Sequence, residues 1–174
     1  MRPDIKVWNP ENPAQWNKTL AWTTVWLSTF SLTLGFCAWF LVPSLAPRLN
    51  EIGFSLTHSQ LYWLVAMVGL SAGTLRILWT FLPPILGTRI LVTLSTGLLL
   101  IPLFCWVYAA QHPDTPYWML ICFALLSGIG GGTFSGLMAS TNYFFPKHER
   151  GLALGIQGGL SDFGTGLVLS LIHI

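Results

Sequence analysis

Long apolar stretches separated by short polar turns dominate this sequence. Five such stretches occur, at residues 20–45, 60–86, 89–110, 116–145 and 151–174. Each approaches or exceeds the roughly 20 residues that a helix needs to cross a bilayer, and none alternates polar and apolar residues as a membrane barrel strand does. Because lipid offers the backbone no hydrogen-bond partner, each segment must satisfy its own polar groups, which helices do. The pattern predicts an all-α fold, a polytopic transmembrane helical bundle, preceded by a leader at residues 1–19.

Charged residues are too scarce for a soluble domain. Of the 174 residues 53% are apolar and only 8% are charged, whereas a soluble domain carries about 25% charged residues to coat its surface. Lipid removes that requirement. The net charge of +2 is small and no basic stripe is present, so the composition excludes a nucleic-acid partner.

Residues that usually catalyse reactions or bind metals are not arranged for either task. Each cysteine lies inside an apolar stretch without a Cys or His partner at ligand spacing, and we interpret all three as apolar filler: Cys37, Cys105 and Cys122. The histidines fall near the ends of the stretches: His58, His112, His148 and His173. No paired carboxylates or Ser/His/Asp set emerges. The sequence predicts a protein that is not an enzyme and has no metal or cofactor.

Basic residues in the short loops predict the topology, because Lys and Arg are enriched on the cytoplasmic side. The leader and the turns after the second and fourth stretches share one side and hold most of them: Arg2, Lys6, Lys18, Arg89, Lys147 and Arg150. The opposite side holds Arg48 alone. We therefore expect an inner-membrane or plasma-membrane protein with its N-terminus in the cytoplasm.

Arg76 is the most informative residue, because it lies near the middle of the second apolar stretch. An arginine at that depth costs at least about 2.5 kcal/mol and is functional by default. Spacings of three and four place it on one helix face with Gly69, Ala72, Gly73 and Thr80. We interpret it as an anion site within the bundle, since its planar fork of donors suits an oxyanion. Two alternatives stay open: the arginine is structural and bonded to helix carbonyls or to an acidic partner, or Gly69, Ala72 and Gly73 form only a packing seam.

The fourth and fifth stretches are rich in glycine. The fourth contains a ladder of small residues that predicts a close helix crossing: Gly128, Gly132, Gly136 and Ser140. Phe134 stands within that ladder as either a pocket wall or a core filler. Residues 151–166 contain six glycines, which is typical of closely packed or distorted helices at transporter substrate sites.

Several segments together resemble the nitrate/nitrite porter family of the major facilitator superfamily. The resemblance extends from Trp8 to about Leu169 and rests on four segments: the leader Trp8-Asn9-Pro10-Glu11-Asn12-Pro13, like that family's W-x-P-E-x-P; Leu75-Arg76; Phe144-Phe145-Pro146-Lys147; and the glycine-rich segment Gly151 to Gly164, like its nitrate signature. It implies the N-terminal part of a major-facilitator-type fold, in a twelve-helix carrier that exchanges nitrate and nitrite or takes up nitrate with protons by alternating access.

The resemblance also implies roles for individual residues. By position, Arg76 matches the arginine that clamps the substrate, and Phe134 matches an aromatic residue that packs against the bound anion. The segment Gly158 to Gly164, which includes Gly159, matches the signature helix that lines the path. One departure is Ser161-Asp162, where the signature usually has Gly-Asn. A carboxylate near an anion path is repulsive unless it is protonated or turned away.

Two further expectations and several rivals complete the interpretation. The fifth stretch reaches the last residue without a flanking anchor, so we expect an N-terminal fragment that transports nothing by itself. The expected partners are the bilayer and nitrate or nitrite, with protons as the candidate coupling ion. The rivals are a carrier of another small anion in the same superfamily, a quinone- or haem-anchoring subunit, and a structural subunit. A haem anchor would need histidines near mid-membrane, and a structural subunit would leave Arg76 unexplained.

Overall fold

Helices make up almost all of the described chain. The computed structural model describes residues 8–172, so the predicted loop charges Arg2 and Lys6, and His173 and Ile174 at the far end, lie outside the described residues. The elements are α1 (Lys18–Leu45), the short 3-10 helix η2 (Ala46–Arg48), α2 (His58–Leu98), α3 (Leu100–Gln111), α4 (Tyr117–Phe144) and α5 (Lys147–Ile172). No strand occurs between residues 8 and 172. The predicted all-α class is confirmed.

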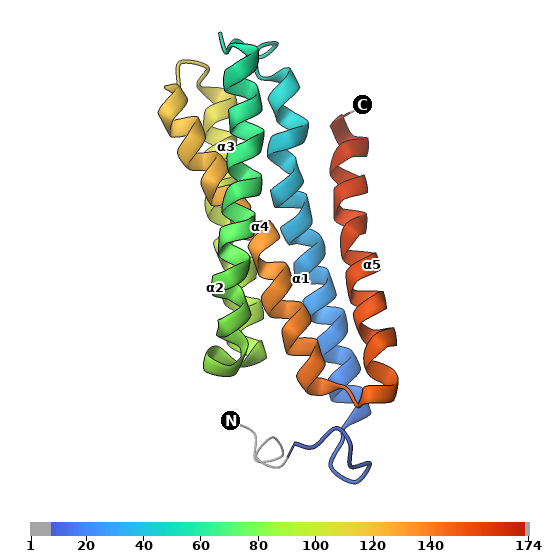
Figure 1. The fold of residues 1–174 in the computed structure, drawn as a ribbon. Coiled ribbons are helices and arrows are strands. Elements are labelled where there is room, and N and C mark those ends of the chain that lie inside the picture. Colours follow the sequence, from blue (N-terminus) through green and yellow to red (C-terminus); the bar gives the residue numbers. More distant parts are fainter. Residues whose placement is uncertain (1–7, 173–174) are drawn as a thin grey trace.

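A sharp reversal at Gly87 divides α2 into two antiparallel arms. The backbone there has φ of 73° and ψ of 154°, a conformation that costs glycine little and other residues much. In Figure 1, α2 runs down to this turn and the chain then climbs back toward α3. The second and third predicted stretches are these two arms, and α3 carries the second arm on to Gln111.

Length and apolarity make the described chain a membrane protein. Four of its helical segments are long and apolar enough to cross a bilayer: Lys18–Arg48, His58–Gln111, Tyr117–Phe144 and Lys147–Ser170. The second of them contains the reversal at Gly87 and therefore has the length for two passes, one on each arm.

Local capping explains where two helices begin. The Oγ1 atom of Thr57 accepts from the N–H of Gln60, and the Gln60 side chain accepts from the N–H of Thr57, which together form a capping box. α2 therefore begins at His58, two residues before the apolar stretch that starts at residue 60. α5 begins at Lys147, not near Gly151, because the Pro146 carbonyl already accepts from the N–H groups of Glu149 and Arg150. Hydropathy misses this first turn because its residues are polar.

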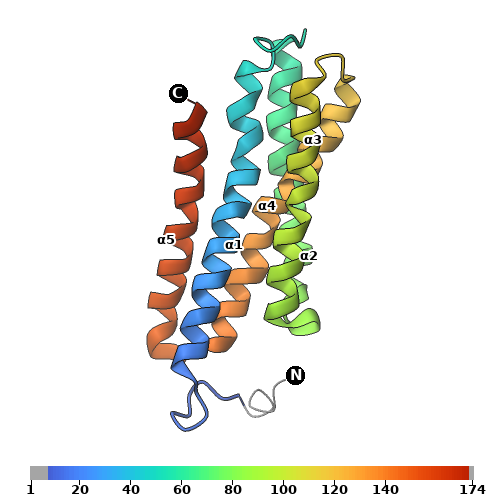
Figure 2. The same ribbon diagram turned by 180° about the vertical axis from the view of Figure 1, so that it is seen from behind.

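α4 is the central helix, and α2, α1, α3 and α5 all pack against it (Figures 1 and 2). Its glycine ladder faces α2. A Cβ atom added at any of three ladder positions would meet that helix within 3.0 Å: Gly128 meets Ser71 at 2.6 Å, Gly132 meets Leu75 at 2.7 Å and Gly136 meets Trp79 at 2.8 Å. The ladder is therefore a packing surface, as predicted, and Ser140 at its end forms a hydroxyl hydrogen bond with Thr88.

α1 approaches α4 on another face and α5 lies along α1. Gly130 of α4 lies directly against Gly35 of α1, and a Cβ atom added at Gly130 would overlap the carbonyl oxygen of Gly35. Gln157 of α5 has no exposed surface. Its Nε2 atom donates to Ser28 of α1 at 2.9 Å, and its Oε1 atom accepts from Thr141 of α4 at 2.7 Å. A buried amide thus ties three helices together.

Gly130→Ala tests the α1–α4 contact. We expect it to lower the free energy of unfolding of the full-length protein by roughly 1–3 kcal/mol, because the new methyl group meets backbone that cannot move aside cheaply. Gly97→Ala is the matched control, since a Cβ atom there meets nothing within 4 Å. Thermal unfolding in detergent measures both. Equal melting temperatures for the two variants would contradict the close approach.

Candidate anion-binding site

Arg76 lies on the first arm of α2, far from both ends of that arm. At 1.5 Å per helical residue it is about 27 Å from His58 and about 16 Å from Gly87. Its side chain is half-buried. Too much of the arm lies on either side for the guanidinium to reach water easily, so its neighbours within the bundle must stabilise the charge.

One nitrogen of the guanidinium is bonded to α4. Arg76 Nε donates to the carbonyl oxygen of Gly131 at 3.1 Å. The bond depends on glycine, because a Cβ atom added at Gly131 would come within 2.8 Å of both Ala72 and Trp39. Close approach of the two helices therefore brings an α4 carbonyl within reach of the arginine.

Among residues 8–172, the two terminal nitrogens of Arg76 have no partner. Neither Nη1 nor Nη2 makes a hydrogen bond to another residue of the described chain, where Nε has the one side-chain bond. The ion pairs found within residues 8–172 are those of Glu149 with Lys18 and His148. The alternative of a purely structural arginine therefore accounts for one nitrogen only. A helix carbonyl accepts from Nε, and no carboxylate of the described residues neutralises the charge.

Aromatic rings flank the guanidinium. The Arg76 Cζ atom lies 5.4 Å from the ring centroid of Trp39 and 5.5 Å from that of Phe134. Phe36 packs edge-on against Phe134, with ring centroids 5.9 Å apart. A cation over an aromatic face gains about 0.5–1 kcal/mol when exposed and about 2 kcal/mol when desolvated. The rings therefore offset part of the cost of keeping the charge in the membrane.

The backbone of Arg76 is also fixed. Its carbonyl oxygen accepts from Ser135 Oγ of α4 at 2.8 Å and from Thr80 Oγ1 one turn later at 2.7 Å. The Ser135 bond joins α2 to α4 next to the aromatic ring of Phe134. Side chain and main chain of Arg76 are thus both held by the same segment of α4.

The predicted stripe of small residues on α2 divides into a packed edge and an open edge. Ala72 is buried against α4 at Gly131. At Gly69 and Gly73 an added Cβ atom would meet nothing within 4 Å in the described chain, and Thr80 is exposed. The stripe is therefore not a continuous packing seam. Arg76 lies at the border, where its free nitrogens have an open side.

The glycines predicted on α5 lie apart from Arg76. Gly164 is buried against Thr33 and Cys37 of α1, and its carbonyl accepts from the Cys37 thiol at 3.4 Å. The nearest group to Gly158 is Met138 of α4, 3.7 Å from an added Cβ atom. No described contact joins these glycines to the guanidinium.

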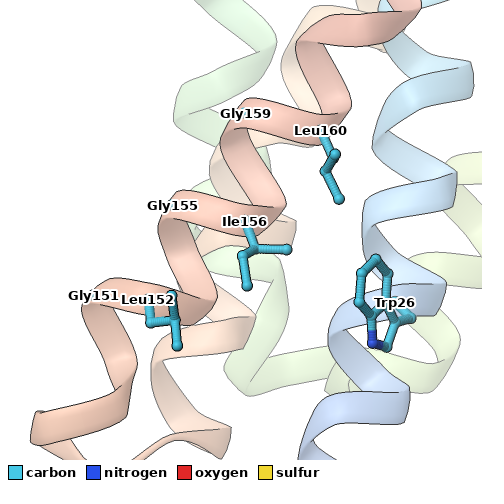
Figure 3. Close-up of a pocket in the computed structure, with 7 residues that line it drawn as sticks. All are labelled: Trp26, Gly151, Leu152, Gly155, Ile156, Gly159 and Leu160. Atoms are coloured by element: carbon cyan, nitrogen blue, oxygen red, sulfur yellow. The ribbon is translucent and has the colours of Figure 1, made fainter.

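Gly159 lines a different surface. It lines an open groove of about 520 Å³ between α1 and α5, which Figure 3 shows. The residues that line this groove are Trp26, Gly151, Leu152, Gly155, Ile156, Gly159 and Leu160. The walls are apolar, so this groove has no group suited to an anion. Asp162, one turn further, is exposed, whereas its neighbour Ser161 is fully buried. The structure thus joins Arg76 and Phe134 and separates the α5 residues from them.

Two members of the site were missed in the sequence. Trp39 lies beside the guanidinium, and the Gly131 carbonyl accepts from it. A signal for the first was present, because Phe36, Trp39 and Phe40 recur at i, i+3 and i+4 and so share one face of α1. The carbonyl gave no signal, since the sequence does not fix the register between α2 and α4.

Comparison with known proteins agrees with this architecture. The family model described as "Major Facilitator Superfamily" matches residues 10–173. The "Probable nitrate/nitrite antiporter NarK2" of Thermus thermophilus is 59% identical over 164 residues, covering 94% of this chain and 37% of that protein. The "Nitrate/nitrite transporter NarU" of Escherichia coli (strain K12) is 40% identical over 167 residues, covering 94% of this chain and 36% of that protein.

A more distant relative is the "Probable nitrate transporter NarT" of Staphylococcus aureus, which is 32% identical over 139 residues, or 80% of this chain. The chain spans a little over a third of the length of these relatives, from 34% to 37%. The helical membrane architecture and the match over nearly its whole length lead to one conclusion: this chain belongs to the Major Facilitator Superfamily.

Proposed function

We propose that the protein containing this chain transports nitrate or nitrite across a membrane and that Arg76 binds the anion. The observation that carries the proposal is a half-buried guanidinium far from both ends of its helical arm, with Nε bonded to Gly131 and no partner for its two terminal nitrogens among residues 8–172. The names of the relatives, a nitrate/nitrite antiporter and nitrate transporters, support the choice of substrate.

The geometry suits a small planar oxyanion. The four N–H groups on Nη1 and Nη2 lie in one plane and can donate two parallel hydrogen bonds to a pair of oxygens. Nitrate and nitrite present such a pair and carry a single negative charge, which a single arginine can neutralise. The edges of aromatic rings are electropositive, so the Trp39 and Phe134 rings can border the anion without repelling it.

Transport then requires release as well as capture. One guanidinium flanked by uncharged rings can bind a monovalent anion. Because the described part of the site has no further positive charge, it does not hold the anion too tightly for release. In an alternating-access carrier, the open side of Arg76 would face each side of the membrane in turn. We propose nitrate/nitrite exchange or proton-coupled nitrate uptake as the mode.

The distribution of basic residues supports an orientation with the N-terminus in the cytoplasm of an inner- or plasma-membrane protein. The start of α1, the Gly87 turn and the α4–α5 turn lie at the same end of the bundle (Figure 1), and Lys18, Arg89 and Arg150 belong to these segments. Arg48 lies at the opposite end. Lys and Arg concentrate on the cytoplasmic side of membrane proteins.

Arg76→Lys tests the role of the guanidinium in the full-length protein. We expect nitrate uptake by cells or proteoliposomes to fall at least about tenfold, which corresponds to about 1.4 kcal/mol. Lysine keeps the charge but lacks the planar fork of donors and the Nε bond to Gly131. Arg48→Lys, at an exposed position, is the matched control and should transport like the wild type. Equal uptake by both variants would refute the assignment.

The chain by itself should transport no nitrate. It spans only 37% of the length of its relative from Thermus thermophilus, and a closed pathway needs helices on the open side of Arg76. Cells that express residues 1–174 alone should take up labelled nitrate no faster than cells with an empty vector. Uptake clearly above that background would show that these helices suffice.

A further inference from the structure

The polar leader before α1 has no part in the proposed anion site, yet it is bound to one end of the bundle. Asn9 Oδ1 accepts from the N–H of Glu11 at 3.1 Å, and Asn12 Oδ1 accepts from the N–H of Ala14 at 3.1 Å. Such Asx turns fold a short segment compactly. The compact segment packs onto the junction between α4 and α5, at residues 143–150.

The end of α4 is built in a way that leaves its carbonyl groups without the usual partners. Phe145, just after the helix, is extended with φ of −117° and ψ of 140°. Pro146 follows and has no N–H group to donate. Glycine-type helix caps depend on N–H groups of the residues just after a helix. The last carbonyls of α4 therefore need donors from elsewhere.

Side chains supply those donors to three consecutive carbonyls. Trp8 Nε1 donates to Tyr143 at 3.2 Å, Trp16 Nε1 donates to Phe144 at 2.9 Å, and Arg150 Nη2 donates to Phe145 at 3.2 Å. Two of the three donors come from the leader, more than 120 residues away in the sequence.

The leader also engages the beginning of α5. The Glu11 carboxylate accepts from the backbone N–H of Lys147, the first residue of α5, at 3.0 Å. A carboxylate at this end of a helix is favoured by the helix dipole. Lys18, the first residue of α1, pairs with Glu149 in the first turn of α5 at 3.0 Å. The leader thus acts on both sides of the junction.

Aromatic packing closes the contact. Phe145 is fully buried, with its ring centroid 6.2 Å from that of Trp16 and 5.2 Å from that of Trp22. Trp8 packs edge-on against Phe144 at 5.5 Å. The buried Phe145 ring and its half-buried aromatic neighbours make the contact more than a set of exposed hydrogen bonds.

α5 depends on this junction more than the other long helices do. It packs along α1 and makes only a small contact with α4, and the face with Gly151, Gly155 and Gly159 is open (Figure 3). Apart from the Gln157 hydrogen bonds, the leader contacts are the main polar interactions that hold its first turns.

We propose that Trp8, Glu11, Trp16 and Lys18 form a leader clasp, a conformational strap that locks the α4–α5 junction and so keeps α5 seated against α1. The clasp gives the tryptophan- and proline-containing leader a defined task that is independent of the substrate. Releasing it frees the carbonyls at the end of α4 and the first N–H groups of α5, and the junction opens locally while the remaining helices stay folded.

Hydrogen–deuterium exchange of the full-length protein in detergent tests the proposal. In Glu11→Ala, exchange of the Lys147 amide should rise at least about tenfold, and in Trp16→Phe exchange across residues 145–150 should rise by a similar factor. Phenylalanine keeps an aromatic ring at position 16 and removes the N–H donor together with part of the indole surface. The controls are Glu51→Ala and Trp118→Phe, both at exposed positions, and exchange in α2 serves as the internal reference.

Two results would overturn the clasp. The first is that amides at the junction exchange at the same rate in Glu11→Ala and Trp16→Phe as in the control variants. The other is exchange that rises equally in α2 and at the junction, because that would indicate general destabilisation and not local release. If Trp16→Phe yields no folded protein, Glu11→Ala decides alone, and an unchanged Lys147 amide counts against the proposal.

Discussion

The close approach of α4 to α1 and α2 is the constraint on which the rest of the structure depends. Glycines at 128, 130, 131, 132 and 136 leave no room for a side chain against the neighbouring helices. Lipid gives apolar surfaces little reason to associate, so dense van der Waals contact must replace the hydrophobic effect between helices. The same closeness places the carbonyl of Gly131 beside Arg76, which a larger residue at that position would prevent.

This packing explains how a charge can be kept deep in the membrane and still be available. Nε of Arg76 is held by the carbonyl, and the rings of Trp39 and Phe134 lie beside the cation. These interactions orient the guanidinium without neutralising it. A carboxylate partner would stabilise the charge more strongly but would compete with any anionic substrate. The arrangement therefore favours binding of an anion over a purely structural role.

Much of the fold follows from the sequence, whereas the site follows only in part. Apolar length predicted the helices, but it missed the polar first turn of α5, which begins at Lys147. The sequence predicted Arg76 and Phe134 as members of the candidate site but not Trp39, because contacts between helices depend on their rotation and register. Gly159 and Gly164 illustrate the same limit: both are glycines on α5, yet one lines an open groove and the other packs on α1. The leader contacts were equally invisible, since they join residues far apart in the chain.

Equilibrium binding tests the central claim most directly, because it separates recognition of the anion from the conformational cycle. Nitrate would be titrated into the purified full-length protein and its Arg76→Gln variant by calorimetry. The account predicts a dissociation constant at least about tenfold weaker for the variant, since charge-assisted hydrogen bonds contribute about 1.5–3 kcal/mol. Equal dissociation constants for the two proteins would contradict it.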